Sequence, residues 1–149
     1  MPARPSMRTL VVGWGLALAA GAAWCQATPA GLWKTIDDET KEEKSLVRIV
    51  EQQGVVSGKI EKIMDPARQN ALCEKCSDER KGKPVIGMTI LRHLRETDDK
   101  GVWEGGDILD PNNGKVYKAR LKPLDGGRKL EMRGYIGPFY RTQTWLRVE

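Results

Sequence analysis

From about residue 31 onward, the chain consists of short segments in which apolar and polar residues alternate. The clearest is Lys115–Lys122, where Tyr117, Ala119 and Leu121 alternate with lysine and arginine. A period of two residues places one side of a strand against a core and the other side in water, as in antiparallel sheets. No segment keeps the 3.6-residue period of a helix over three turns, so we expect an all-β fold.

Eight such segments are separated by residues that favour turns. The turn at Asp110–Gly114 combines proline with glycine, and Asp125–Gly127 ends in two glycines. The predicted strands are Leu32–Thr35, Ser45–Glu51, Val55–Ile63, Met88–Glu96, Val102–Leu109, Lys115–Lys122, Lys129–Tyr135 and Thr142–Val148, with a single helical turn within Asp65–Leu72. An antiparallel sheet of about eight strands loses its free edges by closing into an up-and-down barrel, whose interior holds side chains or one small ligand.

The two ends of this region support closure. Gly31–Trp33 opens the first predicted strand, and Thr144–Arg147 lies in the last one. Because the first and last strands pair in a closed barrel, we expect Trp33 to plug one end. We expect Arg147 to lie over its ring, held by cation–π attraction.

Several motifs resemble a known family. The Gly-x-Trp opening is similar to the first strand of lipocalin-like (calycin) barrels. The longer pattern resembles the bacterial domain-of-unknown-function family 2147, which comprises small exported proteins with a lipocalin-like barrel. The segments that carry it are Cys73–Cys76, Lys81–Met88, Trp103–Pro111, Gly114–Tyr117, Arg133–Gly137 and Arg141–Trp145. The resemblance covers Gly31–Arg147 and implies export and a barrel fold, but the family brings no established activity with it.

Residues 1–27 have the pattern of a cleaved secretory signal peptide. Arg4 and Arg8 precede an uncharged run of about 14 residues, and Ala27 closes an acceptable cleavage site. One alternative is a retained membrane anchor, but the run is shorter than the roughly 20 residues that span a bilayer. The other is a lipid-modified Cys25, but Trp24 directly before it is bulky for a lipoprotein cleavage site. We therefore expect a single barrel domain over residues 28–149, periplasmic or secreted, with no stable membrane span after cleavage.

The composition fits one soluble domain. The chain has 149 residues, of which 40% are hydrophobic and 30% charged, with a mean hydropathy of −0.51. This excludes a multidomain enzyme, a polytopic membrane protein and a disordered chain. The net charge of +5 falls to +3 without Arg4 and Arg8. The basic run at Arg80–Lys83 is balanced by acidic residues between Asp37 and Glu43, so we expect no nucleic-acid partner.

The cysteines and the histidine offer little catalytic chemistry. Cys73 and Cys76 are predicted to form a disulfide that staples the long loop Asp65–Pro84, since exported proteins meet an oxidising environment. A redox-active pair is the alternative, and a structural zinc site would need further ligands. The sequence shows no recognisable nucleophile motif for which His93 could act as the general base. We therefore expect no catalytic residues, no metal and no cofactor.

A candidate binding wall comes from alternation in the last strands. Asp107 shares a predicted face with Trp103, and if Trp103 lies inside, Asp107 needs a partner there, either Arg141 or Tyr117. The last strand places Arg141, Gln143 and Trp145 on one face. The predicted ligand-binding residues are Trp103, Asp107, Tyr117, Arg141, Gln143 and Trp145.

Three functions remain open at this point. The first is non-catalytic binding of a small or lipophilic molecule of the cell envelope inside the barrel. The alternative is an interaction module with a filled barrel, which docks another envelope protein through the loop Asp65–Pro84 or the apolar rim Tyr135–Tyr140. The third is a thiol-redox protein or another enzyme.

Overall fold

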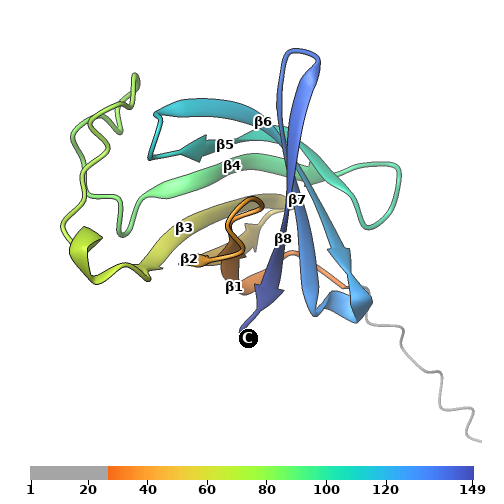
Figure 1. Ribbon diagram of the computed structural model, residues 1–149. Helices are drawn as coiled ribbons and strands as arrows, with labels where there is room; N and C mark the ends of the chain where they lie inside the picture. The colour runs from red at the N-terminus through yellow and green to blue at the C-terminus, as the bar shows by residue number, and fades with distance from the viewer. Residues whose placement is uncertain (1–26) are drawn as a thin grey trace, which may run out of the picture.

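The computed structural model describes residues 27–149, which form a closed antiparallel barrel of eight strands in sequence order (Figure 1). The strands are β1 (Gly31–Ile36), β2 (Glu43–Gln52), β3 (Val55–Ile63), β4 (Thr89–Glu96), β5 (Trp103–Asp110), β6 (Lys115–Leu124), β7 (Lys129–Ile136) and β8 (Phe139–Arg147). Two short 3₁₀ helices, η1 (Pro66–Arg68) and η2 (Asp125–Gly127), lie in connections. The predicted signal peptide, apart from Ala27, lies outside the described residues and stays a prediction.

The barrel closes where β1 pairs with β8, at Trp33↔Arg147 and Lys34↔Leu146. The predicted closed all-β barrel is therefore confirmed, and each predicted strand corresponds to an observed one. The largest difference in boundaries is at β8, which begins at Phe139 rather than Thr142. It begins earlier because the β7–β8 ladder continues to Ile136↔Phe139, leaving a turn of only Gly137 and Pro138.

Trp33 closes one end of the barrel. Its side chain is fully buried, and its indole Nε1 donates a hydrogen bond to the Pro29 carbonyl at 2.7 Å. The guanidinium of Arg147 lies 4.2 Å from the centroid of the Trp33 ring. Arg147 also donates to the carbonyl oxygens of Thr28, Ala30 and Gly127. These bonds connect both ends of the described chain and the β6–β7 connection at the end of the barrel that Trp33 closes.

β4 and β5 bend together halfway along the barrel. His93 in β4 has a φ of 62°, and Gly105 in β5 has a φ of 84°. Next to them, Gly106 approaches β4 so closely that an added Cβ atom would lie 2.0 Å from the carbonyl oxygen of Arg92. Only glycine fits at position 106, because that neighbour is backbone and cannot rotate away.

This bend reverses the alternation within β5. The register with β6 shifts between Trp103 and Gly106, so that Trp103 and Ile108 are both buried although they are five positions apart. Asp107 consequently points out of the barrel, where its carboxylate lies 3.4 Å from the Nε of Arg92 on β4. The prediction that Asp107 faces the interior with Trp103 is therefore wrong, because it assumed an unbroken period of two.

Candidate functional site

A cavity of about 660 Å³ occupies the end of the barrel opposite Trp33. This volume lies within the range of about 300–1,000 Å³ that is usual for small-molecule pockets. Its apolar wall includes Ile60, Ile63, Ile108, Met132 and Trp145, contributed by β3, β5, β7 and β8. Side chains therefore do not fill this end of the barrel, in contrast to the filled barrel of the alternative hypothesis.

Four of the six predicted ligand-binding residues line this cavity, namely Tyr117, Arg141, Gln143 and Trp145. Trp103 lies instead in the packed core, with an indole N–H that has no hydrogen-bond partner among the described residues. Asp107 lies outside the barrel wall. The structure thus brings together the predicted residues of β6 and β8 and separates both predicted residues of β5 from them.

The predicted contact of Asp107 with Arg141 or Tyr117 is also wrong. Arg141 is paired with Asp38, and the hydroxyl of Tyr117 accepts a hydrogen bond from the Asn113 side chain at 3.0 Å. Both partners come from connections between strands. Alternation within a strand therefore could not identify them.

A chain of hydrogen bonds runs from the cavity wall to the β1–β2 loop. The indole N–H of Trp145 donates to Oε1 of Gln143 at 2.9 Å. Gln143 Nε2 donates to Oδ1 of Asp38 at 3.4 Å, and Arg141 donates to both oxygens of Asp38 at 2.6 and 3.2 Å. Asp38 therefore fixes the two polar side chains of β8 that face the cavity mouth.

Asp38 is ionised at neutral pH. Burial raises the pKa of its carboxyl, but hydrogen bonds from Arg141 and Gln143 outweigh burial and hold that pKa below its usual value. The same hydrogen bond raises the pKa of the Arg141 guanidinium. The Asp38 carboxylate and the Arg141 guanidinium are therefore both charged at neutral pH. Sequence reasoning missed Asp38, which was treated only as one of the acidic residues that balance the basic run Arg80–Lys83.

The interior wall also carries a neutral polar pair. The hydroxyls of Thr35 on β1 and Ser45 on β2 lie 2.8 Å apart, and Thr35 is buried. Charged side chains surround the mouth rather than the interior. They are Asp37, Glu42, Glu43, Lys44, Asp65, Arg68, Asp110 and Arg141. The cavity therefore has an uncharged interior, apolar apart from Thr35 and Ser45, and a charged rim.

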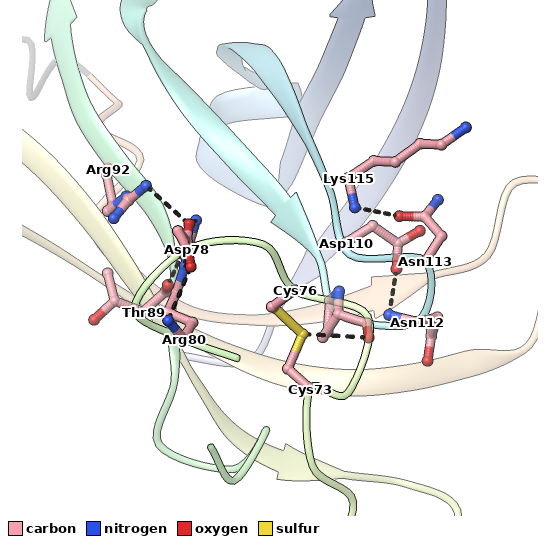
Figure 2. Close-up of a disulfide and its surroundings, with 11 residues drawn as sticks. Cys73, Cys76, Asp78, Arg80, Thr89, Arg92, Asp110, Asn112, Asn113 and Lys115 are labelled. Carbon is pink, nitrogen blue, oxygen red and sulfur yellow. Dashed lines mark hydrogen bonds and ion pairs between the residues drawn. A yellow bond between two sulfur atoms is a disulfide. The ribbon is translucent and has the colours of Figure 1, made fainter. Parts of the chain in front are cut away.

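The long β3–β4 connection, residues 64–88, forms part of the cavity wall through Met64 and Val85. A disulfide joins Cys73 and Cys76 within it, as predicted, and both cysteines are buried (Figure 2). The sulfur of Cys73 lies 3.6 Å from the carbonyl oxygen of Pro111 in the β5–β6 turn. The disulfide-linked segment thus packs against that turn, next to the wall of the cavity.

An ion-pair network fixes the other side of this connection. Arg80 is only 6% exposed and donates hydrogen bonds to Asp78 at 2.6 Å and to the carbonyl of Thr89 on β4 at 2.9 Å (Figure 2). Arg92 joins Asp78, at 3.8 Å, to Asp107. The hydrogen bonds from Arg80 lower the pKa of Asp78 to about 2. The misassigned Asp107 therefore belongs to a network that secures the connection to the outside of the barrel.

Replacing Asp78 with asparagine is expected to lower the free energy of unfolding at neutral pH by about 1–2 kcal/mol, because the buried Arg80 loses its carboxylate partner. The folded-state pKa of about 2 lies below the ordinary value of 3.8, so ionised Asp78 stabilises the fold above pH 3.8 and ceases to do so as the pH falls through 2. The difference between the Asp78→Asn variant and the unmodified protein should therefore close over that interval. Urea unfolding at a series of pH values measures it.

The control is Asp98→Asn on the exposed β4–β5 connection, which should leave stability nearly unchanged at every pH. A stability loss in Asp78→Asn that stays the same size from neutral pH to pH 2 would contradict the proposed ion pairing.

No group of three or more His, Cys, Asp or Glu side chains within residues 27–149 is arranged to hold a metal ion. The same part of the chain contains no helix that is long and apolar enough to cross a membrane.

Comparison with known proteins identifies both a family and a fold. The model of a family described as "Uncharacterized protein conserved in bacteria (DUF2147)" matches residues 31–147. None of the curated proteins matches the chain in sequence. Among solved structures, the chain is similar to protein HP1028 from the human pathogen Helicobacter pylori, which is described as belonging to the lipocalin family. The TM-score is 0.70 and the identity 19%, over 83% of this chain and 84% of that one. At this identity the likeness shows a lipocalin-like fold.

Proposed function

The chain belongs to the DUF2147 family, and we propose that it is an exported, non-catalytic protein whose barrel binds one small lipophilic molecule of the cell envelope. The observation that carries this proposal is the cavity of about 660 Å³, which opens at one end of an otherwise packed barrel. Export is supported by the charged and apolar pattern of residues 1–27.

The distribution of polar groups indicates how a ligand would lie. Apolar side chains such as Ile60 and Met132 surround the interior, so the apolar part of a ligand gains most free energy there. Gln143 and the pair of Arg141 with Asp38 lie at the mouth, where they can meet a polar group. An amphipathic molecule that enters with its apolar end first fits this arrangement.

Trp145 provides a direct signal for binding, because its buried indole lies in the cavity wall. We expect palmitate or lysophosphatidylethanolamine, added to the purified protein, to change tryptophan fluorescence in a saturable manner. Native mass spectrometry should then show one added molecule per chain. The proposal of a binding barrel would be contradicted if tryptophan fluorescence changed linearly with both probes, without reaching saturation, and the mass spectrum showed no adduct.

Filling part of the cavity should weaken binding. In an Ile108→Trp variant, an indole occupies part of the space available to the ligand, and we expect the affinity for palmitate to fall at least about tenfold. The matched control is Thr144→Trp, which adds the same side chain at an exposed position of β8. Isothermal titration calorimetry measures both affinities, and far-ultraviolet circular dichroism verifies that both barrels fold. Equal affinities in the two folded variants would place the binding site elsewhere.

A further inference from the structure

The end of the β7–β8 hairpin exposes large apolar side chains. Ile136, Phe139 and Tyr140 are 48%, 73% and 59% exposed. Figure 1 shows the hairpin projecting beyond the neighbouring strands. The ladder with β6 reaches only Tyr135, opposite Lys118, so the last residues of the hairpin have no strand beside them on that side. Apolar side chains of this size on a projecting segment are typical of an interaction site.

The apolar residues lie on both faces of this hairpin end. Ile136 is paired with Phe139, and Tyr135 with Tyr140, in two successive rungs of the ladder. Successive rungs point their side chains to opposite faces of a sheet. A partner that packs a flat surface against the hairpin, including a second copy of this chain, would cover one face and leave the other in water. A medium that surrounds both faces fits the distribution better.

Cationic side chains lie just behind this apolar end. Lys118 is exposed beside Tyr135, and the guanidinium of Arg133 lies 4.7 Å from the centroid of the Tyr140 ring. Arg133 also contacts Glu131 at 3.6 Å, and Arg141 is already paired with Asp38. At about 3.3 Å per strand residue, Lys118 and Arg133 lie roughly 3–10 Å behind Ile136. The headgroup layer on each side of a bilayer's hydrocarbon core is about 5–8 Å thick, so these cations can lie within it when Ile136 reaches the acyl-chain boundary.

We propose that residues 136–140 of this hairpin insert into the interfacial layer of a lipid bilayer, with Lys118 and Arg133 at the level of anionic headgroups. The free backbone groups of the turn limit insertion to a shallow depth, because the hydrocarbon core offers them no hydrogen-bond partners. Tyrosine and phenylalanine suit this layer. Since Arg141 lines the cavity mouth two residues from Phe139, the docked barrel holds its opening close to the membrane surface.

A tryptophan placed at the hairpin end tests the insertion directly. The Phe139→Trp variant is mixed with vesicles of phosphatidylcholine, or of equimolar phosphatidylcholine and phosphatidylglycerol, carrying bromine on the acyl chains. We expect a blue shift and quenching of the added tryptophan, stronger with the anionic vesicles. The matched control is Val50→Trp, on a side chain that is 41% exposed in β2. Its added signal should not respond.

Two results would overturn the proposal. The first is an added tryptophan at position 139 that responds to neither vesicle. The second is a blue shift that rises with protein concentration in the absence of lipid, since a second copy of the chain would then cover the hairpin end.

A deletion of apolar surface provides an independent measurement. Replacing both Ile136 and Phe139 with serine should lower the partition onto the anionic vesicles about tenfold relative to a Val50→Ser control, as measured by sedimentation. Equal partition of the two variants would contradict the proposal. The affinity of the double variant for palmitate should stay unchanged, because neither residue lines the cavity. The proposal of membrane docking and the proposal of ligand binding in the barrel can therefore be contradicted independently of each other.

Discussion

Replacing Trp33 with alanine is expected to lower the free energy of unfolding by about 3–5 kcal/mol. The side chain is fully buried, so its removal leaves a cavity that the surrounding strands cannot close. The change also removes the ring beneath the Arg147 guanidinium and the hydrogen bond to Pro29. Chemical unfolding at equilibrium, monitored by circular dichroism, measures the loss.

A Trp33→Phe variant separates the packing from the polar contacts. Phenylalanine keeps an aromatic face for Arg147 but lacks the indole N–H that Pro29 accepts, so we expect an intermediate loss of stability. If Trp33→Ala lost less than about 1 kcal/mol, the tryptophan would not be closing the barrel.

The sequence predicts the strands well because their pattern is local. Leu121 and Leu130 are fully buried, as the alternation along β6 and β7 requires, and Tyr117 lies on the same side. Arg141, Gln143 and Trp145 share a face of β8 for the same reason. Where a strand is regular, a period of two is sufficient to place its side chains relative to the core.

The error at Asp107 shows where this reasoning stops. Two adjacent glycines interrupt β5, and the sequence does not show that Gly105 adopts a positive φ while Gly106 contacts the backbone of β4. That geometry depends on the matching bend at His93, which lies in another strand. A single unpaired residue is sufficient to move every following side chain to the other face.

The role of Asp38, and whether the barrel is hollow or filled, could not be predicted for a different reason. Asp38 meets Arg141 across 103 residues of sequence, and no periodic pattern connects them. The empty volume at the mouth likewise depends on how the β1–β2 loop and residues 64–88 pack over the strand ends. Such contacts arise only from the closed barrel as a whole.

Gly114 provides the sharpest test of how the disulfide-linked connection supports the cavity. An added Cβ at this position would lie 1.9 Å from the carbonyl oxygen of Lys75 and 2.9 Å from the backbone nitrogen of Cys76. Neither backbone atom can rotate away, so Gly114→Ala must push the disulfide-linked segment off the β5–β6 turn. Gly114 also has a φ of 72°, which alanine adopts only at a cost of about 1–2 kcal/mol. We therefore expect a total loss of stability of about 3 kcal/mol or more.

The matched variant is Gly126→Ala, because Gly126 has a similar φ of 64° but nothing within 4 Å of its added Cβ. Gly126→Ala should lose only the stability that the positive φ costs, about 1–2 kcal/mol, and should keep its affinity for palmitate. Gly114→Ala should in addition bind palmitate at least about tenfold more weakly, because Met64 and Val85 of the displaced connection line the cavity. Chemical unfolding measures the stability of the two variants, and calorimetric titration measures their affinity for palmitate.

If the two alanine variants lost the same stability, the steric contact with Lys75 would not explain the need for glycine at position 114. If they bound palmitate equally, the connection would not shape the site.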